Sequence, residues 1–150
     1  MKKVTLLLVA FMAVACNFNS SVSYTNSGDD IERGIEISRK FYSCQAKHDT
    51  INLYKLFDES VDINSVKEML HSRDSVYGMA KSTENMKGQS LNTTYNGKKT
   101  IQYLVETTVK FENGELFEYL QWIEEEGNEP KISQYLIYRE QQDLAFEVED

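Results

Sequence analysis

The chain has 150 residues and carries 24 Asp and Glu against 16 Lys and Arg, a formal net charge of −8. This length suits one folded domain built around a single core. An acidic surface repels the phosphates of nucleic acid, so DNA and RNA are excluded as expected partners.

The first sixteen residues have the pattern of an export signal. Lys2 and Lys3 precede an apolar run from Val4 to Ala15, which is the order of a secretory signal peptide. As a helix this run would reach only about 18 Å, well short of the roughly 30 Å hydrocarbon core of a bilayer. We therefore expect residues 1–15 to be a cleaved signal peptide.

The next feature is a cysteine directly after this run. The residues Ala13-Val14-Ala15-Cys16 resemble the lipobox of bacterial lipoproteins, in which the cysteine is lipidated and becomes the mature N-terminus. The resemblance implies cleavage between Ala15 and Cys16 and a firm acyl anchor. It also implies a place in the bacterial cell envelope, outside the cytoplasm and facing the periplasm. The alternative is ordinary cleavage after Ala13-x-Ala15, which would release an unanchored protein.

Composition divides the rest of the chain into three parts. Residues 16–30 are rich in Ser and Asn and lack apolar periodicity, which predicts a flexible stalk after the lipidated cysteine. Residues 31–139 are expected to form a single domain. The acidic residues 140–150 are expected to be a C-terminal extension.

Three helices are predicted in the first half of the domain. Apolar residues recur every three or four positions over 31–47, 51–57 and 64–77, which is the helical period. Asp29 or Asp30 could cap the first helix, and Gly78 fits the left-handed residue that ends the third.

After Gly78 the pattern changes from a period of 3.6 to a period of 2. Apolar and polar residues alternate over 99–111, 115–125 and 131–139, and the weakly patterned residues 79–95 are predicted as one long or interrupted strand. Asn96-Gly97 and Asn113-Gly114 have the composition of hairpin turns. Three N-terminal helices packed on a curved antiparallel sheet of about four strands make an α+β fold.

Residues at the ends of these elements carry a resemblance to a known family. They are His48-Asp49, Arg73-x-x-x-Tyr77-Gly78 and Gly127-x-x-x-Lys131-Ile132-x-x-Tyr135-x-Ile137. Over residues 31–139 the chain is similar in this respect to a family of uncharacterised bacterial lipoprotein domains. These resemble the cystatin-like, nuclear-transport-factor-two-like cone fold. The resemblance implies a curved sheet wrapped around a long helix, and it brings no activity with it.

Residue groups typical of catalysis or metal binding are few. His48 and His71 are 23 residues apart and lack a second ligand at helical metal-binding spacing, so we expect no metal site and a helix-end role for His48. Cys44 is predicted to be a small buried hydrophobe, and the acidic run 124–126 is predicted to be solvated. No catalytic residue and no cofactor is expected.

A set of mostly aromatic residues could line a cavity in such a fold. The candidates lie on elements that would meet inside it, and they are Tyr42, Tyr77, Tyr103, Glu106, Tyr119 and Tyr135. A pocket walled by rings is the usual form of a small-molecule site. The alternatives are plain packing for the tyrosines and, for Glu106, an ion pair across the sheet. The single tryptophan, Trp122, is expected in the core.

These features predict a non-catalytic, membrane-anchored domain that binds an unknown protein or small molecule. Two alternatives stay open. One is an isomerase-like or dehydratase-like enzyme of the cone fold that acts on a small apolar ligand, and the other is a purely structural lipoprotein. A cavity with a buried Asp or Glu would favour the enzyme, whereas a filled core with an exposed apolar patch would favour a protein-binding module.

Overall fold

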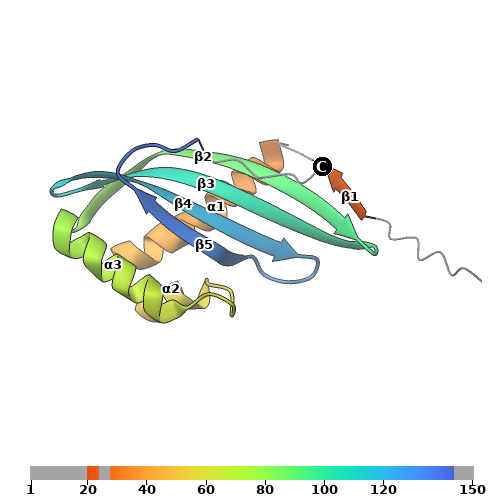
Figure 1. Ribbon diagram of the computed structural model, residues 1–150, viewed down its shortest axis with the longest axis horizontal. Helices are drawn as coiled ribbons and strands as arrows, with labels where there is room; N and C mark the ends of the chain where they lie inside the picture. Colours follow the sequence, from red (N-terminus) through yellow and green to blue (C-terminus); the bar gives the residue numbers. More distant parts are fainter. Residues whose placement is uncertain (1–19, 24–27, 144–150) are drawn as a thin grey trace, which may run out of the picture.

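The computed structural model describes residues 20–23 and 28–143, in which helices lie against a twisted sheet (Figure 1). The helices of this part are α1 (Gly28–Ala46), α2 (Thr50–Lys55) and α3 (Ile63–Tyr77). Its strands are β1 (Ser20–Ser23), β2 (Ala80–Tyr95), β3 (Lys98–Phe111), β4 (Gly114–Glu125) and β5 (Lys131–Tyr138). Each strand pairs antiparallel with the next, in the order β1-β2-β3-β4-β5. The predicted α+β class, with three helices and an antiparallel sheet, is confirmed.

Local side chains fix where the helices begin and end. Asp49 caps α2 and Asp62 caps α3, each through a carboxylate oxygen that accepts a backbone N–H in the first turn. Gly78, with φ 77°, ends α3 as predicted. Asp29 and Asp30 lie inside the first turn of α1, so the prediction that one of them caps this helix is wrong.

The long strands are held in register by their turns and by alternation. Asn96 and Gly97 have φ values of 50° and 78°, which both central residues of a tight hairpin turn require, so the predicted β2–β3 hairpin is confirmed. The pairing of β2 with β3 is shifted between Ala80 and Ser82 and again between Glu84 and Lys87. Such bulges bend a strand, and they lie in the half of β2 that is nearest to α3 in the chain.

One face of the sheet packs against α1. Tyr103 lies opposite Trp122 and Val105 opposite Leu120 across β3 and β4, and none of these four side chains is more than 1% exposed. The Trp122 indole donates a hydrogen bond to the Ser38 hydroxyl of α1 at 2.9 Å. This pairs the indole N–H of a buried side chain and joins helix to sheet. The prediction that Trp122 belongs to the core is confirmed.

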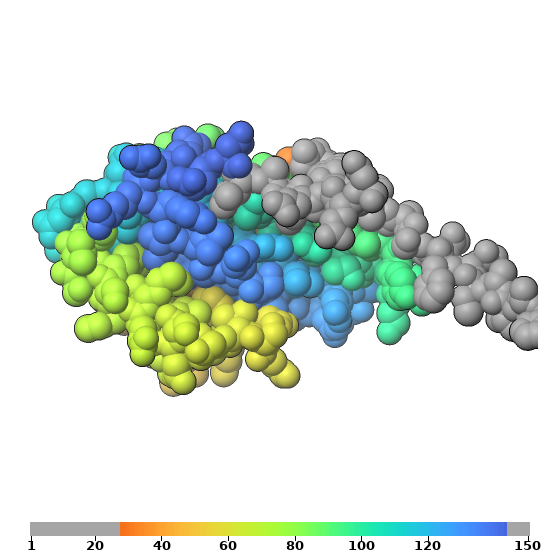
Figure 2. Space-filling view, in the orientation of Figure 1, coloured from red at the N-terminus to blue at the C-terminus, as the bar shows by residue number. Residues whose placement is uncertain are grey.

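Helices α2 and α3 lie at the opposite end of the sheet from β1 (Figure 1). The segment after α2 pairs with β5, since the Ile132 N–H donates to the Leu56 carbonyl and the Asp58 N–H donates to the Ile132 carbonyl. Figure 2 shows the two helices packed along β5 on the molecular surface.

Strand β1 extends the sheet beyond the four strands that were predicted. It pairs with the end of β2, with Ser20 opposite Tyr95 and Ser23 opposite Asn92. Four residues of the segment predicted as a flexible stalk, 16–30, are therefore part of the sheet, and its last three residues are part of α1. An edge strand can pair through its backbone alone, so it needs no hydrophobic pattern.

The ends of the chain fall partly outside the described residues. The predicted signal peptide, Ala15 and Cys16 all lie there, as do residues 144–150. Of the predicted C-terminal extension, Gln141 and Gln142 contact the sheet through Glu106 and Tyr119. None of the helices in the described part of the chain combines the length and the apolar character needed to cross a membrane.

Candidate ligand-binding site

A cavity of about 660 Å³ lies where α1, α2, α3 and the start of β2 meet. Cavities of roughly 300–1,000 Å³ are typical of small-molecule sites. His48, in the left-handed conformation with φ 54°, stands in the turn between α1 and α2. The Asp49 cap then starts α2 at the rim of the cavity, which Thr50 lines.

Apolar side chains form much of the cavity wall. Each lining element contributes to them: Leu53 and Tyr54 from α2, Leu70 from α3, and Met79 and Met86 from the beginning of β2. Leu53 and Leu70 are also part of the buried core. An apolar body could therefore enter the cavity and remove this surface from water.

Positive charge gathers in the same cavity, although the chain as a whole is acidic. Arg39, Lys67 and Lys81 line it together with both histidines of the chain, His48 and His71. Within the described residues none of these five side chains forms an ion pair, and the Lys67 ammonium lies 5.1 Å from the centre of the Tyr54 ring. The site is therefore electropositive on an otherwise negative molecule.

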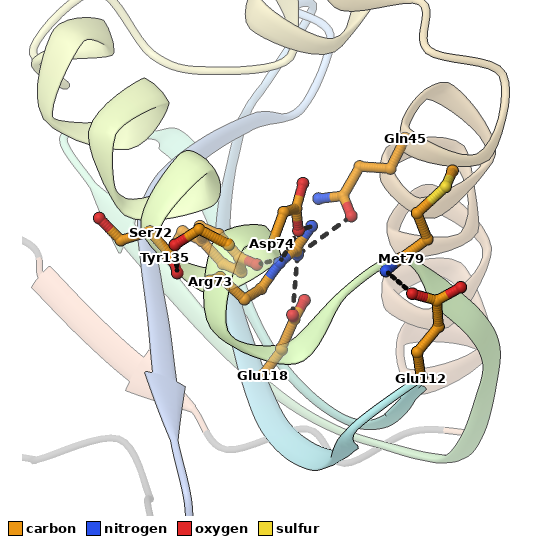
Figure 3. Close-up of polar contacts among 9 residues, drawn as sticks. Gln45, Ser72, Arg73, Asp74, Met79, Glu112, Glu118 and Tyr135 are labelled. Atoms are coloured by element: carbon orange, nitrogen blue, oxygen red, sulfur yellow. Dashed lines mark hydrogen bonds and ion pairs between the residues drawn. The ribbon is translucent and has the colours of Figure 1, made fainter.

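A buried ion pair lies behind the cavity and ties α3 to β4 (Figure 3). Arg73 lines the cavity, and its Nη1 donates to Glu118 Oε1 at 2.9 Å and to the Tyr135 hydroxyl at 3.1 Å. The Glu118 side chain is 0% exposed and that of Arg73 is 6% exposed. Burial raises the pKa of Glu118, and the adjacent guanidinium opposes this shift.

Three further contacts hold the guanidinium of Arg73. Its Nε donates to Asp74 Oδ1 at 2.8 Å and its Nη2 contacts the same oxygen at 2.7 Å. Its Nη1 further donates to the Gln45 side-chain carbonyl at 3.2 Å. Arg73 therefore stabilises the structure of the site. It also forms an ion pair with Asp74, the single acid among the described residues that line the cavity.

Four buried polar atoms near this pair have no hydrogen bond of good geometry within the described residues. They are the hydroxyls of Tyr42 and Thr107, Nε2 of Gln45, and Oε2 of Glu118. Burial, and then the charge of Glu118, raise the pKa of Tyr42, so its hydroxyl stays protonated. Tyr42 and Gln45 line the cavity. The Tyr42 hydroxyl lies beside Glu118 and Thr107, so Gln45 supplies the cavity with one unused donor, Nε2.

The six candidate lining residues do not all meet in one place. Tyr42 lines the cavity and Tyr135 lies behind it beside Arg73. Tyr77 packs on Phe111 with ring centres 5.9 Å apart. Tyr103 is fully buried under α1 and donates to Glu124 at 2.7 Å, so neither of these two reaches the cavity.

Glu106 and Tyr119 lie on the other face of the sheet. They line a separate hollow of about 530 Å³ with Gln141 and Gln142. Lys87 stands directly opposite Glu106 in the β2–β3 register, at 3.8 Å. The alternative that Glu106 forms an ion pair across the sheet is confirmed, and it does not project toward the helices.

Glu118 was not among the site residues expected from the sequence. Its signal is a charged residue at a position whose neighbours along one face of β4, Leu116 and Leu120, are buried. Arg73 carries the same signal on α3, where it continues the apolar stripe of Val66 and Leu70. A charge in each of two apolar stripes could have pointed to a buried pair.

The other candidates of the sequence analysis take ordinary places. Cys44 is half-buried and lines the cavity, and burial raises the pKa of its thiol. Glu124 is held by Arg33 and Tyr103 instead of being solvated, so that prediction is wrong for this residue. Among the described residues no group of three or more His, Cys, Asp or Glu side chains is placed to hold a metal ion.

Comparisons of the chain with family models, with curated proteins and with solved structures found no match. The geometry and charge of the cavity therefore carry the functional argument.

Proposed function

We propose that this protein is a membrane-anchored binding domain of the bacterial cell envelope, and that it holds a small molecule in the cavity between α1, α2, α3 and β2. The observation that carries the proposal is the cavity of about 660 Å³ with apolar walls and convergent polar groups. The anchor rests on the lipobox-like residues that end at Cys16. The proposed cone form rests on the family resemblance, with α1 packed across the sheet.

The proposed role is binding without catalysis. A nucleophile needs activation, and the raised pKa of Cys44 keeps its thiol protonated. Arg73 is held by Asp74, Glu118, Gln45 and Tyr135. These groups support the shape of the site.

The enzyme alternative has one observation in its favour. Glu118 is a buried carboxylate with a raised pKa, and the tyrosines Tyr42 and Tyr135 interact with it, an arrangement that general acid–base chemistry uses. Glu118 is not among the residues that line the cavity, however, and its Oε1 is held by Arg73. Turnover of a bound compound that Glu118→Gln abolishes without weakening binding would establish the enzyme.

A blocking substitution tests the binding proposal. Ala46 is exposed at the end of α1 and lines the cavity, so Ala46→Trp should fill space there without disturbing the core. The matched control is Ser72→Trp, at an exposed position of α3 outside the lining. The readout is the rate at which N-ethylmaleimide modifies Cys44, mapped by peptide mass spectrometry so that Cys16 is scored separately.

We expect 1-octanol or octanoate to slow the modification of Cys44 in the native protein and in Ser72→Trp. In Ala46→Trp neither compound should change the rate. Equal modification of Cys44 in the native protein with and without both compounds would refute the binding proposal.

A further inference from the structure

We propose that the ligand of this cavity is an anion, an apolar body that ends in a carboxylate or phosphate group, and that Gln45, Lys67 and Lys81 recognise the charged end. This inference rests on the proposed binding function and adds the chemical class of the ligand. Its basis is an excess of donors and positive charge over acceptors in the cavity.

The first step concerns the charge of the residues that line the cavity. Arg39, Lys67 and Lys81 carry full positive charges and have no ion-pair partner among the described residues. Asp74 is the single acid of the described lining, and Arg73 holds it through Nε and Nη2. The cavity therefore keeps three uncompensated positive charges in a chain whose formal net charge is −8, and an anion is the ligand that this field attracts.

The second step is the orientation of Gln45. Its side-chain carbonyl accepts from Arg73 at 3.2 Å, which turns the amide so that Nε2 is the free end. That nitrogen is buried and has no partner among the described residues. A buried donor without an acceptor is costly, and a ligand oxygen would satisfy it.

The third step is Tyr42. Its side chain is 8% exposed and lines the cavity, whereas its hydroxyl lies beside Glu118 and Thr107. The hydroxyl therefore belongs to the buried polar group around Glu118, and the ring of Tyr42 is the part that faces the ligand.

The fourth step is the apolar wall. Leu53, Leu70 and Met86 would contact the body of the ligand, so inorganic phosphate alone should bind weakly. A carboxylate and a phosphate group share the acceptor oxygens and the negative charge that the donors require. The inference commits to this shared chemistry.

The experiment compares octyl compounds that differ only in their head group. Octanoate and octyl phosphate carry an anion, octylammonium a cation and 1-octanol no charge, and inorganic phosphate is added as a head without a body. Binding is measured by calorimetry and by protection of Cys44 from N-ethylmaleimide. We expect the two anions to bind at least about tenfold more tightly than octylammonium and 1-octanol.

Substitutions then locate the charged end. Gln45→Glu keeps an oxygen for Arg73 and replaces the free Nε2 donor by an acceptor, so it should weaken both anions at least about tenfold. Its matched control is Gln134→Glu, at an exposed position of β5 outside the lining. The double variant Lys67→Gln/Lys81→Gln should also weaken the anions, whereas Lys98→Gln, an exposed lysine outside the cavity, should not.

The outcomes separate the inference from the function on which it rests. If all four octyl compounds protect Cys44 equally, the cavity binds small molecules but the inference about charge is wrong. Tighter binding of octylammonium, or full anion affinity in Gln45→Glu and in the double lysine variant, overturns the inference as well. If none of the octyl compounds protects Cys44, the binding function itself fails.

Discussion

Arg73 and Glu118 form a buried ion pair, and its contribution to stability differs from that of a pair at the surface. Their side chains are 6% and 0% exposed, so both charges have been removed from water. The attraction of a buried pair roughly offsets this desolvation, whereas one partner left alone is strongly destabilising. The pair is therefore a condition for the fold around the cavity more than a source of extra stability.

Removing one partner should be worse than removing both. We expect Arg73→Met to lower the free energy of unfolding by about 3–5 kcal/mol, because Glu118 then has no cation. The double variant Arg73→Met/Glu118→Leu should recover most of that loss. Urea unfolding at pH 7 measures both, and a double variant less stable than the single one would contradict the expectation.

Glu118 should also give the protein a specific pH dependence. Its pKa in the folded state is raised above the ordinary value of 4.5, so the folded state binds its proton more tightly than the unfolded state does. Its contribution to stability is then complete below pH 4.5 and is lost as the pH rises through the folded pKa. We expect the stability of the native protein relative to Glu118→Gln to fall from pH 4 to pH 7, measured by urea unfolding.

Glu124 is the matched control for this experiment, because its pKa is lowered by hydrogen bonds from Arg33 and then from Tyr103. Its contribution to stability is present above the unfolded value of 4.5 and is lost as the pH falls. The stability of the native protein relative to Glu124→Gln should therefore change with pH in the opposite direction. The same sign for both variants would show that Glu118 is not the group responsible.

At the scale of elements, strand β1 is the strand with the weakest structural attachment to the rest of the molecule. It covers four residues and pairs only with the end of β2. The long strands are held by pairing on both sides or by the core, whereas an edge strand of this length gains little beyond its backbone hydrogen bonds.

A chain that begins at Gly28 should therefore fold and lose little stability. We expect a fall in melting temperature of less than about 5 °C, with faster amide exchange at residues 92–95 of β2 and unchanged exchange in β3 and β4. Hydrogen exchange followed by mass spectrometry measures this. Unchanged exchange at residues 92–95 would contradict the pairing of β1.

The sequence predicts the elements that are buried on one side, because burial on one side imposes a regular spacing of apolar residues. Ile101, Tyr103, Val105 and Val109 alternate, and the structure places Tyr103, Val105 and Val109 in the interior at no more than 1% exposure. Strand β1 has no such pattern, because pairing at the edge of a sheet depends on the backbone and does not require apolar side chains. The start of the first helix was misplaced, because Asp29 and Asp30 could equally cap this helix or lie in its first turn.

The cavity was harder to predict from the sequence than the helices and strands around it. Its lining comes from four elements and includes both His48 and His71, which lie 23 residues apart in the chain. Local spacing tests neighbours along one helix, so it says nothing about residues that come together from different elements. Of the six predicted lining residues, Tyr42 alone lines this cavity, because the others were chosen by element and not by position along it.

At the scale of the whole molecule, the acidic charge and the proposed acyl anchor have opposite effects on membrane binding. The formal net charge of −8 makes the surface a poor partner for anionic lipid headgroups, so electrostatics cannot hold the protein at a membrane. The described part of the chain contains no helix able to cross one. We propose that acyl chains on Cys16 hold the protein at the membrane.

Replacing that cysteine should therefore release the protein. We expect the native protein to enter the detergent-rich phase in a phase-separation assay, and Cys16→Ser to stay in the aqueous phase, because two or more acyl chains bind a bilayer firmly and none remain in the variant. Cys44→Ser is the matched control and should partition like the native protein. Mass spectrometry of the mature N-terminus gives the independent readout. An unmodified Cys16, or a Cys16→Ser variant that still partitions into detergent, would contradict the anchor.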